Sequence, residues 1–146
     1  MESSGSGACR TADYNPVVLR VAVPLLIVFA LLVAGCGGST VYSDAKTSAC
    51  LQARGAKISP PGSSDLVAST APGGAFAAAL GDNSVKLVFG QTDAQAQNLV
   101  AAYERFAFPN VRAGLPDVLR RYNNVVTLWH EHPQDADLSL VIGCLR

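Results

Sequence analysis

The chain has 146 residues, with 11 basic and 11 acidic side chains, and 49% of its residues are apolar. A formal charge of zero at pH 7 argues against a dedicated nucleic-acid-binding protein, which needs a basic surface to displace counterions from phosphates. The length allows one globular domain rather than two. Charged residues make up only 15% of the chain, against about a quarter in soluble domains, and much of this deficit lies near the N-terminus.

A continuous apolar run occupies residues 21–33, thirteen residues without a charged or hydrogen-bonding side chain. A membrane-spanning helix needs about 20 apolar residues, whereas the apolar core of a secretory signal has about 7–15. Arg10 and Arg20 precede the run, as the positive-inside bias requires. The pattern therefore predicts an export signal over residues 1–35.

The sequence Val33-Ala34-Gly35-Cys36 at the end of this run resembles the lipobox of bacterial lipoproteins. The resemblance implies that Cys36 receives a diacylglyceryl group on its sulfur and that a signal peptidase then cuts before it. Acyl chains such as palmitate would hold the mature protein at the extracytoplasmic face of the cell membrane, since two or more chains suffice for stable anchoring. Residues 36–43 would be the lipidated cysteine and a flexible tether of small residues.

An uncleaved membrane helix is the alternative for the same segment. Extended backwards, the apolar stretch covers residues 17–34, which is 18 residues. Arg20 then lies near the end of the helix, where its long side chain reaches the interface. Both alternatives place a single exported domain, residues 44–146, outside the cytoplasmic membrane.

Two cysteines remain in the exported part, Cys50 and Cys144. An even pair in an oxidising compartment favours a disulfide, which would close a loop of 94 residues (144 − 50). The alternatives are two unrelated buried thiols or a metal pair. Zinc is disfavoured because the chain has no CxxC motif and no histidine at finger-like spacing.

The first part of the exported domain predicts a helix, a short strand and a loop. The helix is expected over residues 43–54, capped by Ser43 or Asp44 and ended by Gly55. The strand is expected over residues 56–58. Residues 59–74 are rich in proline and glycine and predict a loop. That loop has room for one helical turn near residues 65–69, capped by Ser63 or Ser64.

Two apolar runs, residues 75–80 and 85–89, flank the turn formers Gly81-Asp82-Asn83-Ser84 and predict a β-hairpin. Thr92-Asp93-Ala94-Gln95 fits a capping box. The helix behind this box has the strongest apolar periodicity in the chain, at Ala96, Leu99, Val100, Tyr103, Phe106 and Ala107.

The C-terminal part predicts a loop, a strand and a helix. Pro109 ends the preceding helix, and a loop is expected over residues 110–116. Residues 125–129 are apolar and rich in strand formers, which predicts a buried strand. Pro133 ends the strand and opens a last helix over residues 134–145.

Between residues 56 and 129 the expected order is strand, helical turn, two strands, helix and strand. This is the order of a ferredoxin-like split βαβ fold. We therefore expect an α+β sandwich of one antiparallel sheet and packed helices, with an extra helix at each end. A disulfide between Cys50 and Cys144 would tie the two extra helices together.

Candidate chemistry is sparse. His130, Glu131 and His132 are the only clustered metal-type ligands. In a strand, His130 and His132 would point the same way and could share a metal, but a catalytic site needs a third ligand and an open position. The alternative is a polar strand end in contact with water. The sequence has no GxSxG elbow, GxGxxG loop or Walker motif.

Arg112, Arg120 and Arg121 form a basic spot that could approach anionic headgroups or a cell-wall polymer. The alternative is a solvated loop or the start of a strand.

The exported part is also similar to small bacterial envelope lipoproteins of unassigned role, and this resemblance implies neither an activity nor a cofactor. It rests on Ala49-Cys50-Leu51, Gly55-Ala56-Lys57, Asn124-Val125-Val126 and Gly143-Cys144-Leu145-Arg146. We expect a membrane-anchored, non-catalytic domain that binds an envelope protein or polymer. The alternative is a metal-binding protein or metal-dependent enzyme that uses His130 and His132.

Overall fold

The computed structural model describes residues 40–146. The predicted export signal, residues 1–35, and the predicted lipidation site Cys36 lie outside the described residues. The contacts of the chain separate Gly38–Arg146 as a compact unit. Both apolar clusters of the core and the disulfide belong to this unit. Because it contains its own core, Gly38–Arg146 is a self-contained folding unit.

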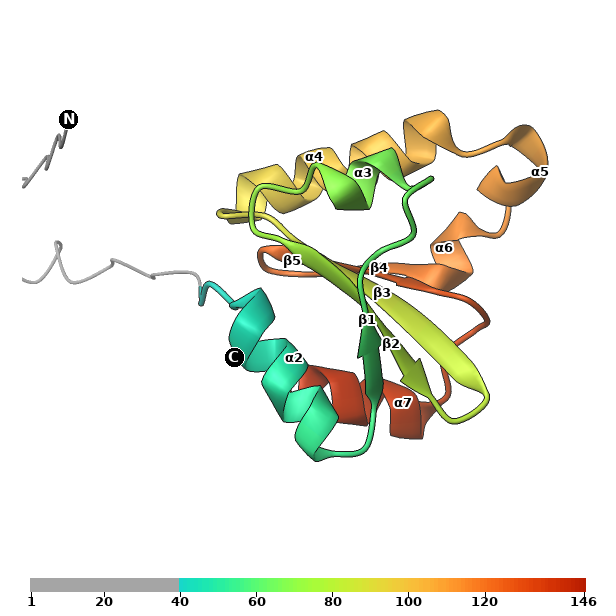
Figure 1. Ribbon diagram of the computed structural model, residues 1–146. Coiled ribbons are helices and arrows are strands. Elements are labelled where there is room, and N and C mark those ends of the chain that lie inside the picture. Colours follow the sequence, from blue (N-terminus) through green and yellow to red (C-terminus); the bar gives the residue numbers. More distant parts are fainter. Residues whose placement is uncertain (1–39) are drawn as a thin grey trace, which may run out of the picture. The chain divides into compact units, whose positions relative to one another are not determined.

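The expected helices and strands occur in the expected order, with the further elements α5, α6 and β4 between α4 and β5 (Figure 1). The helices are α2 (Asp44–Ala53), α3 (Leu66–Ser69), α4 (Asp93–Phe106), α5 (Pro109–Arg112), α6 (Leu115–Val118) and α7 (Asp135–Ile142). The strands are β1 (Lys57–Ser59), β2 (Ala75–Leu80), β3 (Asn83–Phe89), β4 (Leu119–Tyr122) and β5 (Val125–Trp129).

The five strands form one antiparallel sheet in the order β1-β2-β3-β5-β4. This confirms the expected α+β class, an antiparallel sheet packed with helices as in ferredoxin-like folds. Within that class, β1 and β2 are direct neighbours in the sheet. The expected hairpin of β2 and β3 has a turn of two residues, because Leu80 pairs with Asn83. Gly81 begins this turn with a φ of 60°, which glycine adopts without steric cost.

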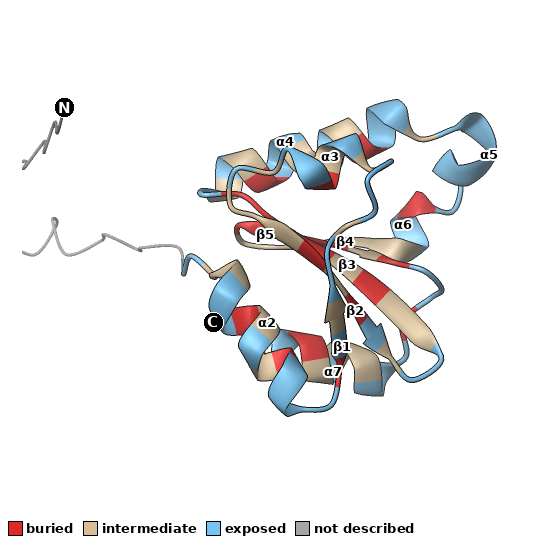
Figure 2. Ribbon diagram, viewed as in Figure 1, coloured by how far each residue is buried: buried red, intermediate tan, exposed pale blue. Residues whose placement is uncertain are grey.

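Helices cover both faces of the sheet (Figures 1 and 2). Side chains from α2 and α7 pack with Val85, Leu87 and Phe89 on one face. Side chains from α3 and α4 pack with Val88 and Val126 on the other. Successive residues of a strand point to opposite faces, so the central strand β3 contributes to both halves of the core.

The disulfide between Cys50 and Cys144 is present, with Cα atoms 5.5 Å apart. It joins α2 to the segment just after α7, because α7 ends at Ile142 and does not continue to residue 145 as expected. The backbone N–H of Ser43 also donates to the carbonyl of Arg146 at 2.6 Å. The two ends of the domain are therefore held together by one covalent bond and one hydrogen bond. Gly55, with a φ of 91°, follows the end of α2 as expected.

Three local predictions were wrong or incomplete. The cap of α3 is Asp65, not Ser63 or Ser64, because the Asp65 carboxylate accepts from the backbone N–H of Ala68 at 2.9 Å. The loop expected over residues 110–116 contains the short helices α5 and α6, both of which have a proline in their first turn. A further strand, β4, precedes the two-residue turn Asn123-Asn124 and pairs with β5.

Candidate functional site

A large apolar groove opens between the helices on the α3 and α4 face of the sheet, with a volume of about 930 Å³. We call it the α3–α4 groove. Its floor is formed by Lys86 of β3 and Leu128 of β5, which are register partners in the sheet. Its walls come from α3, α4, α6 and the connection between α4 and α6: Leu66, Val67, Thr70, Leu99, Ala102, Tyr103, Phe106, Ala107, Phe108, Val111, Leu115 and Val118.

The rim of the groove carries unusually exposed apolar side chains. Phe106 is 71% exposed, Phe108 is 75% exposed and Leu66 is 73% exposed. The sequence pattern placed Phe106 on the buried face of α4, together with Tyr103. Tyr103 is buried as expected, but beyond it the groove separates the end of α4 from the sheet. Exposed apolar side chains that border a groove make it a candidate binding site.

Polar groups meet at one place in the groove, around Asp65. The Asp65 carboxylate pairs with the ammonium of Lys86. It also accepts a hydrogen bond from the hydroxyl of Tyr103, at 3.2 Å to Oδ2. Together with the cap on Ala68 N–H, these contacts join α3, β3 and α4 through a single carboxylate.

The charge states at this cluster follow from its surroundings. Burial alone would raise the pKa of Asp65, but hydrogen bonds from Lys86 and Ala68 and the positive charge of Lys86 hold that pKa below its ordinary value of 3.8. Burial and the nearby Asp65 charge raise the pKa of Tyr103 above its ordinary value of 10.0. At neutral pH the cluster therefore contains an ion pair and a protonated phenol.

This arrangement favours binding of an apolar molecule. Lys86 and Asp65 balance each other's charge, and the phenol proton of Tyr103 is directed to the carboxylate. The remaining lining side chains are mostly apolar. Ligand sites of a few hundred to about 1,000 Å³ with apolar walls and few polar groups are typical of small-molecule binding.

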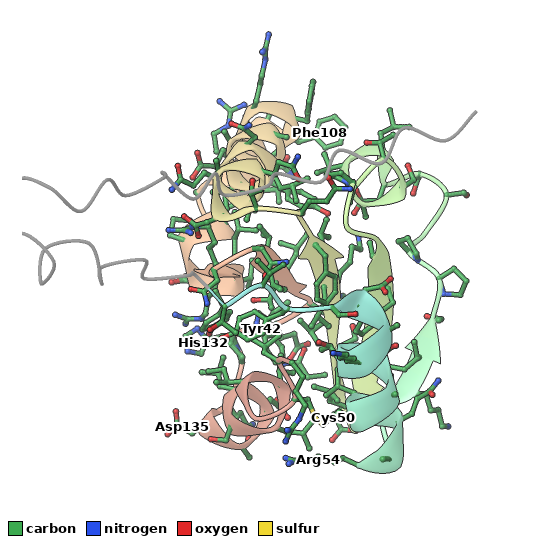
Figure 3. The ribbon with its side chains drawn as sticks, turned by 90° about the vertical axis from the view of Figure 1, so that its left-hand side faces the viewer. Tyr42, Cys50, Arg54, Phe108, His132 and Asp135 are labelled. Atoms are coloured by element: carbon green, nitrogen blue, oxygen red, sulfur yellow. A yellow bond between two sulfur atoms is a disulfide. The ribbon has the colours of Figure 1, made fainter. Side chains whose placement is uncertain are left out.

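Of the two histidines, one lines the groove and the other does not. His130 is one of its lining residues, whereas His132 is exposed on the connection to α7 (Figure 3). Strand β5 ends at Trp129, so the side-chain alternation of a strand does not extend over His130 and His132. Within residues 40–146, no group of three histidine, cysteine, aspartate or glutamate side chains is arranged to hold a metal ion.

The three arginines of the predicted basic spot belong to two different elements, β4 and α5. Arg120 and Arg121 belong to strand β4, and Arg121 forms an ion pair with Asp93 at the start of α4. Both arginines line a smaller hollow of about 270 Å³, to which Glu104 also contributes. Arg112 lies in α5 and donates to the backbone carbonyl of Ala107, in the connection that precedes α5.

The first residues that the structure describes, from Thr40 on, lie beside the turn between β4 and β5. The side chain of Asn124, only 1% exposed, accepts from the N–H of Tyr42 at 2.7 Å and donates to its carbonyl at 2.9 Å. Its Nδ2 also donates to the carbonyl of Gly90 at 2.7 Å. Asn123 donates to the carbonyl of Thr40 at 3.1 Å. The residues from 40 to 43, which the sequence assigned to the tether, are therefore bound to the domain.

Among the helices of the described part of the chain, none has the length and apolar character that crossing a bilayer requires.

Comparison with known proteins adds no assignment: no protein-family model, no curated protein and no solved structure matches this chain.

Proposed function

We propose that this protein is a lipid-anchored, extracytoplasmic lipoprotein of the cell envelope whose domain binds the hydrocarbon chain of an amphiphile, without catalysis. The observation that carries the proposed ligand is the α3–α4 groove, an apolar volume of about 930 Å³ bordered by exposed aromatic rings. The lipobox-like sequence ending at Cys36 supports the anchor.

The ligand class follows from what lines the groove. Apolar walls favour a hydrocarbon chain, because transfer from water gains about 25 cal/mol per Å² of buried apolar surface. For the polar end of the ligand we propose the ammonium of Lys86, whose side chain is 24% exposed and which lines the groove together with Asp65. Asp65 is its one hydrogen-bonding partner among the described residues, so the ammonium retains N–H donors for a carboxylate, ester or phosphate oxygen.

A fluorescent polyene fatty acid tests the groove directly. Ala102 lines the groove, whereas its neighbour Ala101 is exposed outside it. We expect Ala102→Trp to fill the groove and weaken probe binding at least tenfold, while Ala101→Trp, on the same helix, leaves binding within about twofold. Equal affinity of the two variants for the probe would contradict the assignment of the groove.

The anchor is tested separately, on the full-length protein in its membrane. We expect the mature protein to begin at Cys36 and to carry the mass of added acyl chains, and we expect Cys36→Ser to lose that mass. A first residue of Met1, or an unchanged mass and membrane association in Cys36→Ser, would reject lipidation.

A further inference from the structure

Three large apolar side chains are exposed at the end of α4, just before α5 and within α5. Phe106 is 71% exposed, Phe108 is 75% exposed and Val111 is 49% exposed, within six consecutive residues of the chain. In Figure 3, Phe108 lies in the helical layer remote from Cys50 and the disulfide. We call residues 105–112 the phenylalanine tip.

The phenylalanine tip is also basic. Arg105 and Arg112 lie at its ends and it contains no aspartate or glutamate, with Glu104 directly before it. The guanidinium of Arg105 lies 5.9 Å from the centre of the Phe106 ring. Arg112 donates to the carbonyl of Ala107 at 3.1 Å, which fastens the turn between α4 and α5. The exposed rings therefore lie on a turn that this hydrogen bond stabilises, with an arginine at each end.

Aromatic rings beside arginines are the combination that favours the interface of an anionic bilayer. The rings bury their apolar bodies among the headgroups, and the arginines gain from the negative surface potential. We infer that the phenylalanine tip docks on anionic phospholipid bilayers and brings the rim of the α3–α4 groove, to which Phe106 and Phe108 belong, to the lipid. The inferred route of the ligand rests on the proposed function, because the same rings line the groove and an acyl chain would enter it without crossing water.

The position of the tether is compatible with this docking. Thr40 lies beside the turn between β4 and β5, and Arg121 of β4 pairs with Asp93 at the start of α4. The tip is at the opposite end of α4, whose 14 residues extend about 21 Å at 1.5 Å per residue. Thr40 follows Cys36 by four residue steps in the sequence, and four steps span at most about 14 Å. A domain anchored at Cys36 and docked through the tip would therefore lie with α4 along the membrane.

Vesicle binding by the separate folding unit, residues 38–146, tests the inference without the anchor. Sedimentation would use vesicles of equal phosphatidylcholine and phosphatidylglycerol content, with pure phosphatidylcholine vesicles for comparison. We expect Phe106→Ser with Phe108→Ser to weaken binding to the anionic vesicles at least tenfold. Ile142→Ser is the matched control, because Ile142 is 45% exposed on α7, and its binding should stay unchanged. Arg105→Gln and Arg112→Gln should each cost about fivefold on anionic vesicles.

A site-specific probe gives a second measurement. The cysteines of residues 38–146 are joined in the disulfide, so Phe108→Cys supplies a single thiol for an environment-sensitive dye. Its emission should shift to the blue on anionic vesicles, whereas a dye at Ile142→Cys should not respond. Equal responses at the two positions, or undiminished binding of the double phenylalanine variant, would overturn the docking.

The failure of docking and the failure of the proposed function give different results. Ala102→Trp should lose the fatty-acid probe but keep vesicle binding, since the tip is intact. Fatty-acid binding without vesicle binding would refute the docking alone. Vesicle binding without fatty-acid binding by the parent domain would refute the ligand of the proposed function and leave the docking surface in place.

Discussion

Removal of the disulfide should destabilise the domain more than each of the other changes predicted below. The bond between Cys50 and Cys144 closes a loop of 94 residues, nearly the whole domain. In the chain-entropy treatment of the unfolded state, a loop of this length stabilises the fold by about 4.7 kcal/mol. For a domain of about 110 residues, that difference lowers the melting temperature by about 20 °C.

The assay is urea unfolding of residues 38–146, followed by the fluorescence of Trp129. This is the one tryptophan of the chain, and it is buried in the core. Cys50→Ala with Cys144→Ala should unfold at much lower urea than the oxidised parent. Added reductant should lower the urea midpoint of the parent to about that of the double variant. The midpoint of the double variant itself should not change. A loss of less than about 1 kcal/mol in the double variant would refute the reasoning that loop closure is a main source of stability.

Three further changes test the local structure. Asn124→Ala should cost about 3 kcal/mol, because it leaves a buried carbonyl and the backbone of Tyr42 without partners; chemical denaturation measures this. Asp65→Asn removes the ion pair, and it should abolish the part of the acid dependence of stability that comes from Asp65. Since the pKa of Asp65 is lowered in the folded state, its contribution is complete above the ordinary pKa of 3.8 and is lost as the pH falls below it. Parent and variant should therefore differ in melting temperature at pH 7 and converge in acid; a constant difference would contradict this. Thr92→Ala should cost about 1 kcal/mol by removing the cap on Gln95 N–H, with unchanged stability as the contrary result.

The parts of the fold that the sequence predicted have strong local signals. The capping box appears as expected, since the Thr92 hydroxyl accepts from Gln95 N–H at 3.2 Å. Gln95 reaches back to the N–H of Gln91, at 2.6 Å, one residue before the cap. The strand over residues 125–129 and the helix after Pro133 are also present. Each of these depends on residues that are close together in the chain.

Strand β4 was not predicted because its sequence, Leu-Arg-Arg-Tyr, has little apolar alternation. It lies at the edge of the sheet and pairs only with β5, so its two arginines need not be buried. The sequence did contain one signal, the pair Asn123-Asn124 directly before a buried strand. Asn123 has a φ of 49°, a conformation that asparagine adopts more readily than most residues in tight hairpin turns.

The candidate site depends on contacts between distant parts of the chain. Asp65 and Tyr103 are 38 residues apart in sequence, and Asp65 and Lys86 are 21 apart, so no spacing rule connects them. The periodicity of α4 predicted an apolar face, but whether Phe106 meets the sheet or an open groove depends on where α3 and α6 lie. A close succession of Phe106, Phe108 and Val111 between two arginines was the available signal.

Native mass spectrometry of the protein purified from its own membranes tests the central claim most directly. Under gentle conditions, the parent and Ala101→Trp should each retain a noncovalent adduct with the mass of an acyl-chain lipid, in addition to any covalent acylation. Ala102→Trp should lack that adduct because its groove is filled. An adduct that persists in Ala102→Trp, or a parent that carries none even after incubation with lipid vesicles, would contradict the assignment of the α3–α4 groove as a hydrocarbon-binding site.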